Sequence, residues 1–146
     1  MKRKLAAALL VCPLTWAACT HAGPVPAPVV ELGQSFSLRV GESARTAGSL
    51  QVGFESVSND SRCPKGVQCV WAGDAILKVW LQQGSGPRTA HELHAGPGFS
   101  PSVVALGHEL RLVRLEPFPV ANRVIVQSDY VATLSLQHSA PAAPER

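Results

Sequence analysis

The feature that most constrains this chain is a series of short runs, from Val29 onward, in which apolar and polar residues alternate. Turn residues separate the runs, and no stretch repeats its apolar residues every 3.6 positions over a helical length. Alternation with a period of two places the apolar side chains on one face of an extended strand. The pattern therefore predicts an all-β domain.

Seven runs are predicted strands, at residues 35–40, 50–55, 75–82, 88–94, 108–115, 124–126 and 130–136. In the fifth run the alternation slips between Leu112 and Val113, which predicts a β-bulge. Glycines and prolines at 96–101 predict a connecting loop. Strands of this length and spacing favour a two-sheet, immunoglobulin-like sandwich, with a small β-barrel as the alternative.

The N-terminus has the order of segments found in a secretory signal. Lys2, Arg3 and Lys4 precede an apolar run at 5–14, and the small residues Ala17 and Ala18 follow it. The run is shorter than the roughly 20 residues that a membrane-spanning helix needs. The alternative is a buried first helix of a cytosolic domain. The basic start favours export, with a signal peptide that ends at residue 18 or extends to 22.

The charge of the chain depends strongly on this segment. Of 13 Lys and Arg residues three lie at positions 2–4, so the remainder carries ten against ten Asp and Glu. Binding to nucleic acid needs a basic surface that neutralises phosphates. The near-neutral mature chain therefore predicts no nucleic-acid partner.

Cys19 follows the small residues at the position where bacterial lipoproteins carry their lipidated cysteine. Lipidation would tether the protein to a membrane, facing the periplasm. Trp16 departs from the aliphatic residue usual in that motif. The alternative, cleavage after Ala22, would remove Cys19 and release a soluble periplasmic or secreted protein.

The remaining boundaries follow from composition. Prolines and small residues at 19–28 predict a flexible or extended tether. The β domain is predicted at 29–138, followed by a disordered tail at 139–146.

Segment 60–73 holds two further cysteines, Cys63 and Cys69. In an oxidising compartment this pair predicts a disulfide. Pro64 and Gly66 supply the restricted and the permissive backbone conformations that a tight ring needs. The loop-entropy model gives such a ring about 2 kcal/mol of stabilisation.

The polar residues of this segment allow two interpretations. The Asp60 carboxylate can accept loop N–H groups, and the Arg62 guanidinium can bridge carbonyl oxygens or a carboxylate. The indole of Trp71 is predicted to lie over the disulfide or the core. The loop then serves the stability of the domain. The second interpretation is a recognition surface, with candidate residues Asp60, Arg62, Lys65, Gln68 and Trp71.

The same segment resembles the signature of a family of short exported bacterial proteins described as lipoproteins. In that family a D-S-R-C-P element precedes a second Cys and a W-A-G. The matching residues here are 60–64, Cys69 and 71–73, and the likeness extends loosely to 117–119 and to the strand that begins at Tyr130. The resemblance implies export, a disulfide and a β fold, and it brings no established activity.

Searches for catalytic and metal-binding patterns give no candidate. The stretch from His91 to His94 is one residue shorter than a zinc-binding His-Glu-x-x-His, and in a strand these two histidines face opposite ways. Gly84-Ser85-Gly86 is a turn signal and does not form a nucleophile elbow. We therefore predict no catalytic residue, no metal, no cofactor and no enzymatic activity.

The leading functional hypothesis is a non-catalytic, envelope-associated module that binds a protein or surface polymer through loop 60–73. One alternative is a protease inhibitor that presents Lys65 on the disulfide ring. Another is a periplasmic metal-handling protein that uses its histidines. A membrane partner is predicted only through the lipid anchor.

Overall fold

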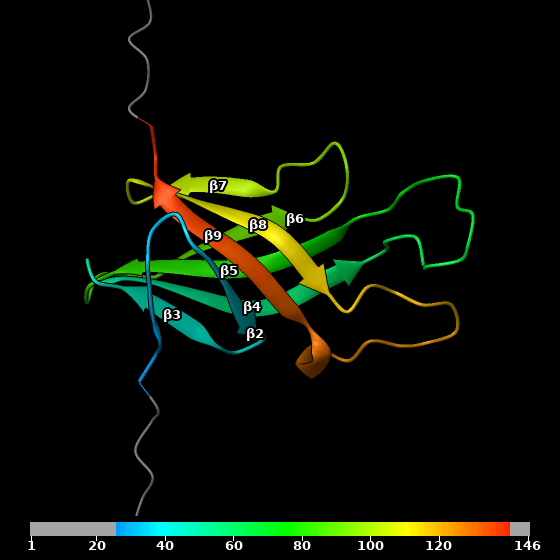
Figure 1. The fold of residues 1–146 in the computed structure, drawn as a ribbon, viewed down its shortest axis with the longest axis horizontal. Coiled ribbons are helices and arrows are strands. Elements are labelled where there is room, and N and C mark those ends of the chain that lie inside the picture. The colour runs from blue at the N-terminus through cyan, green and yellow to red at the C-terminus, as the bar shows by residue number, and fades with distance from the viewer. Residues whose placement is uncertain (1–25, 141–146) are drawn as a thin grey trace, which may run out of the picture.

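The computed structural model describes residues 26–140, and they fold into two facing β-sheets (Figure 1). The predicted signal peptide, Cys19, most of the predicted tether and residues 141–146 of the predicted tail lie outside the described residues. Within residues 26–140, no helix has the length and apolar character needed to cross a membrane.

Nine strands and one short 3-10 helix follow one another along this part of the chain. They are β1 (Val29–Val30), β2 (Ser35–Arg39), β3 (Ser43–Thr46), β4 (Leu50–Asp60), β5 (Ala75–Gln83), β6 (Thr89–His94), β7 (Ser102–Ala105), β8 (His108–Glu116), η1 (Gln127–Asp129) and β9 (Val131–His138).

The strands form a five-stranded sheet in the order β1-β3-β4-β5-β6 and a four-stranded sheet in the order β2-β9-β8-β7. All neighbours are antiparallel except β1 and β3. The predicted all-β class and two-sheet sandwich are confirmed, and the two sheets do not close into the alternative barrel. The connections are mainly meanders, β3 to β6 and β7 to β9, where immunoglobulin domains use Greek keys.

The core lies between the sheets and follows the alternation of the sequence. In β5, Leu77, Val79 and Leu81 are fully buried, whereas the intervening Lys78 is exposed. The opposite sheet contributes a matching row from β8 and β9. The largest fully buried side chains are Phe54, Leu38, Leu50, Leu77, Leu81, Leu93, Leu110, Leu134 and Leu136.

Six of the predicted runs lie in β2, β4, β5, β6, β8 and β9, and the predicted bulge is confirmed because the β8–β9 register skips Val113. The predicted strand at 124–126 is wrong. Near it, the backbone of Val57 in β4 pairs with the Gln127 amide, which accepts from the N–H of Val57 at 3.0 Å and donates to its C=O at 2.7 Å. The short strands β1, β3 and β7 were not predicted.

Three long loops meet at one end of the sandwich, which we call the loop end. They are the β4–β5 loop (61–74), the β6–β7 loop (95–101) and the β8–β9 segment (117–130). In Figure 1 the first and third project to the right. Hydrogen bonds join them: Lys65 N–H donates to Pro119 O at 3.0 Å, and Gly96 N–H donates to Asp74 Oδ1 at 2.6 Å.

Candidate functional site

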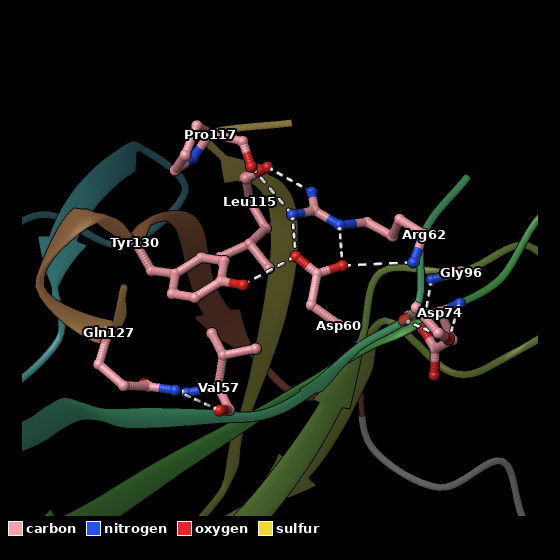
Figure 2. Close-up of polar contacts among 10 residues, drawn as sticks. Val57, Asp60, Arg62, Asp74, Gly96, Leu115, Pro117, Gln127 and Tyr130 are labelled. Atoms are coloured by element: carbon pink, nitrogen blue, oxygen red, sulfur yellow. Dashed lines mark hydrogen bonds and ion pairs between the residues drawn. The ribbon is translucent and has the colours of Figure 1, made fainter. Parts of the chain in front are cut away.

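A buried ion pair lies at the base of the loop end (Figure 2). Asp60 ends β4, and Arg62 follows two residues later. The Arg62 guanidinium donates two hydrogen bonds to the Asp60 carboxylate, from Nε to Oδ1 at 2.8 Å and from Nη2 to Oδ2 at 2.6 Å. Oδ1 also accepts the backbone N–H of Arg62 at 3.3 Å. The pair therefore fixes the direction in which the chain leaves β4.

Arg62 also connects this loop to the opposite sheet. Nη1 donates to Leu115 O at 2.8 Å, and Nη2 donates to Pro117 O at 2.9 Å (Figure 2). The predicted bridging of carbonyls and a carboxylate is thus what the structure shows. The prediction that Asp60 and Arg62 contact a partner gains no support, because Arg62 is only 7% exposed and its donors bind internal acceptors.

Tyr130 completes this cluster, and sequence reasoning missed it. Its hydroxyl donates to Asp60 Oδ2 at 2.9 Å. Burial raises the pKa of Tyr130 to about 12, together with its hydrogen bond to Asp60 and the carboxylate charge. Burial also acts to raise the pKa of Asp60, but the hydrogen bonds from Arg62 and Tyr130 and the charge of Arg62 outweigh it and lower that pKa. The carboxylate therefore stays ionised inside the protein.

The two ends of the β4–β5 loop are held against each other at Ser61 and Asp74. The N–H and the hydroxyl of Ser61 both donate to Asp74 O, at 2.7 and 3.0 Å, and the N–H of Asp74 donates to Ser61 Oγ at 3.2 Å. Gly73 allows this approach, because a Cβ there would lie 1.8 Å from Ser61 O and its φ is +71°. The glycine is required by the packing.

The predicted disulfide between Cys63 and Cys69 is confirmed, with a Cα–Cα distance of 6.0 Å. Inside the ring, the N–H of Val67 donates to Pro64 O at 3.2 Å, and Gly66 has a φ of +78°. These are the features of a turn that needs glycine at its third position. The ring is anchored to the β8–β9 segment at Lys65, whose ammonium lies 5.6 Å from the Phe118 ring centre.

The tip of the loop is exposed and apolar. Val70 is 90% exposed and Trp71 is 82% exposed. The prediction that the indole covers the disulfide or the core is therefore wrong, because most of the indole is exposed to solvent. Lys65 and Gln68, the other predicted recognition residues, are exposed beside it.

Exposed apolar side chains continue across the loop end. They lie on all three loops, next to segments that are themselves hydrogen-bonded to one another. Together with Val70 and Trp71 we call this set the loop-end patch; its other members are Val67, Phe99, Phe118, Val120, Val124 and Val126. Exposed apolar side chains gathered at one end of a domain favour an interaction site.

A second polar cluster joins the β4–β5 and β6–β7 loops. Nδ1 of His94 lies 2.5 Å from Asp74 Oδ2, and the N–H of Gly96 donates to Asp74 Oδ1 at 2.6 Å. The His94 ring stacks on Phe99 with centres 5.3 Å apart. Asp74 thereby orients an imidazole at the loop end. The sequence carries no local signal that would bring Asp74 and His94 together.

His91, the other histidine of β6, contacts Thr89 Oγ1 at 2.9 Å and does not join His94. In the part of the chain that the structure describes, no group of three or more His, Cys, Asp or Glu side chains is placed to hold a metal ion.

Fold and site together define a β-sandwich with a disulfide-braced, apolar loop end. Comparisons with protein-family models, with curated proteins and with solved structures find no match to the chain.

Proposed function

We propose that the protein is a non-catalytic binding module that contacts a partner protein through the loop-end patch. The observation that carries the proposal is the exposure of Val70 and Trp71, two adjacent apolar side chains at the tip of a braced loop. Trp is among the residues that contribute most to binding energy at protein interfaces. Leaving the Trp71 indole in solvent forgoes the stability that its burial would give. Within residues 26–140 no structural benefit offsets this cost.

The rigidity of the loop supports the same proposal. The ring at Cys63–Cys69, the ion pair at Arg62 and the contact between Ser61 and Asp74 each restrain the loop at a different point. A surface that is already ordered loses less conformational entropy when it binds. A braced loop that only stabilised the domain would gain more from burying its indole.

The cellular location is part of the proposal, and it is supported only by the sequence. The basic N-terminus, the apolar run and the resemblance to exported bacterial proteins support a location in the cell envelope, tethered through Cys19 or free in the periplasm. A surface polymer remains the second class of partner that the sequence suggested. The loop-end patch favours a protein, because its exposed groups are mostly aliphatic and aromatic.

The inhibitor hypothesis gains no support from the geometry of Lys65. A protease substrate-like loop presents an extended backbone that can pair with the enzyme. Here Lys65 sits in a turn, its N–H is bonded to Pro119 O, and it bridges to Val120. The lysine backbone is therefore already paired inside the protein.

Site-specific photo-crosslinking in envelope fractions tests the proposal. A photoreactive phenylalanine analogue replaces Trp71 in one variant and Leu106 in the other; Leu106 is also apolar and exposed, but lies in the β7–β8 turn at the opposite end. We expect a discrete protein adduct from position 71 and none from 106. Val70→Ser should weaken that adduct, in line with about a tenfold loss of affinity. Equal adducts at both positions, or none at 71, would refute the proposal.

A further inference from the structure

A groove of about 540 Å³ lies at the loop end, between the β6–β7 loop and the last residues of β8, and two members of the loop-end patch line it. The residues that line it include the buried Leu112 and Leu115 and the aromatic Phe99 and Phe118. Phe99 is 55% exposed and Phe118 is 43% exposed. We call it the β8 groove.

The groove exists because β7 is shorter than β8. The two strands pair from Ala105↔His108 to Ser102↔Arg111, and one further bond joins the N–H of Leu112 to Pro101 O at 2.8 Å. β8 continues to Glu116, but among the described residues no strand follows it on that side. The Arg62 guanidinium occupies part of the vacated edge by bonding Leu115 O. The rest of the space suits an extended chain lying along β8.

The ionisable side chains that line the groove are all basic. Its ionisable side chains are Arg62, His94 and Arg114, and no Asp or Glu lines it. Asp60 and Asp74, the carboxylates nearest to two of them, are already bound to Arg62 and His94. Arg114 has only a loose contact of 3.7 Å with Glu116, and both of these side chains are exposed. Arg114 is therefore the cation most available to a ligand.

We propose that the β8 groove binds an extended acidic segment of a partner protein, with a carboxylate on Arg114 and apolar side chains between Phe99 and Phe118. Opposite charge gives specificity and orientation, while the aromatic walls supply the buried apolar contact. This inference rests on the proposed function in taking the partner to be a protein, but it concerns a different surface from Val70 and Trp71.

Fluorescence anisotropy with the full chain and short, end-capped, labelled peptides tests the inference. One probe alternates Glu with Val, and its counterpart alternates Lys with Val. We expect the Glu peptide to bind at least about tenfold more tightly than the Lys peptide. The Arg114→Glu variant should lose about tenfold or more in affinity for it. Arg111→Glu is the matched control, because Arg111 is an exposed arginine of the same strand outside the groove.

Three outcomes would overturn the inference: equal binding of the two peptides, no binding of the Glu peptide, or equal losses from Arg114→Glu and Arg111→Glu. A polyuronate that binds where the Glu peptide does not would assign the groove to a polysaccharide. Trp71→Ala should leave peptide binding within about twofold, because Trp71 does not line the groove. A negative result for peptide binding in the β8 groove therefore does not change the crosslinking result at position 71. A negative crosslinking result likewise does not change the peptide-binding result.

Discussion

The hydroxyl of Tyr130 and the carboxylate of Asp60 meet at 2.9 Å although 70 positions separate them in the chain. Asp60 ends β4 in the five-stranded sheet, and Tyr130 immediately precedes β9 in the four-stranded sheet. The same Oδ2 atom also accepts a hydrogen bond from Nη2 of Arg62. One carboxylate therefore fastens the two sheets together beneath the loop end.

Replacing Tyr130 with Phe removes the hydroxyl and keeps the ring. Because the bond is made to a charged acceptor, the free energy of unfolding should fall by about 1.5 kcal/mol. Urea denaturation measures it. Ser37→Ala is the control, since Ser37 forms an exposed 3.3 Å contact with Thr133, and its effect should stay within about 0.5 kcal/mol. A Tyr130→Phe variant as stable as the parent would show that the bond contributes nothing.

The raised pKa of Tyr130 predicts a loss of stability in alkali. A group whose pKa is higher in the folded state holds its proton there while the unfolded chain releases it. The free energy of unfolding should therefore decline as the pH rises from about 10 toward the folded pKa of about 12. Denaturation at a series of pH values checks this, and Tyr130→Phe should show a weaker decline. A pH dependence identical in both proteins would contradict the assignment.

Removing the guanidinium should be more damaging than removing the phenol. Arg62→Met leaves the Asp60 carboxylate buried without its cation, and such losses cost about 3 kcal/mol or more. Arg114→Met is the matched control: that arginine is exposed, so the change should cost less than about 0.5 kcal/mol. Adding Asp60→Asn to Arg62→Met should recover part of the loss. If the double variant is no more stable than the single one, the buried charge is not the cause.

The disulfide should be complete in freshly prepared protein. Without reductant, Cys63 and Cys69 should resist alkylation, which the mass of the protein reports. Replacing both with Ser should lower the free energy of unfolding by about 2 kcal/mol on the loop-entropy model. Wild type unfolded in reductant should match the double variant. Uptake of alkylating reagent at both cysteines of native material would contradict the pairing.

Two glycines of the β4–β5 loop allow the stability cost of a strained backbone conformation to be measured apart from the cost of a steric clash. Gly66 and Gly73 both have positive φ, but a Cβ at Gly66 meets nothing within 4 Å, whereas at Gly73 it meets Ser61 O at 1.8 Å. Gly66→Ala should therefore cost about 1 kcal/mol. Gly73→Ala should cost about 3 kcal/mol or more, because backbone must move. Thermal unfolding compares them, and equal costs would mean that the close approach at Ser61 does not matter.

The sequence predicted what local spacing controls. Cys63 and Cys69 lie close enough along the chain for a short turn to join them, and the slip of alternation at Val113 marks its bulge directly. The same holds for the prediction that Asp60 accepts a loop N–H and that Arg62 bridges carbonyls or a carboxylate, although their ion pair was not itself predicted. In each case the information lies within a few residues.

The sequence could not predict contacts that depend on how the strands are arranged. His94 meets Asp74 because β5 and β6 pair Ile76 with His94, and that register is not visible in either residue. The wrong prediction of a strand at 124–126 has the same cause, because strand pairing depends on the arrangement of the sheets. It has β-forming valines, but the backbone of Val57 in the neighbouring β4 is bonded to the side chain of Gln127 and not to another strand.

The pairing of β2 with β9 bears on the order in which the domain is assembled. β2 has a single neighbour in its sheet, and its register runs from Ser35↔Ser135 to Arg39↔Val131. The hairpins from β3 to β6 and from β7 to β9 can form from nearby residues, whereas joining β2 to β9 means closing nearly the whole domain into one loop, which is slow. During synthesis from the N-terminus, β2 therefore waits unpaired until the last strand has emerged. A nascent chain stalled before β9 would carry a finished first sheet and an unprotected strand beside it, which is the state that chaperones recognise.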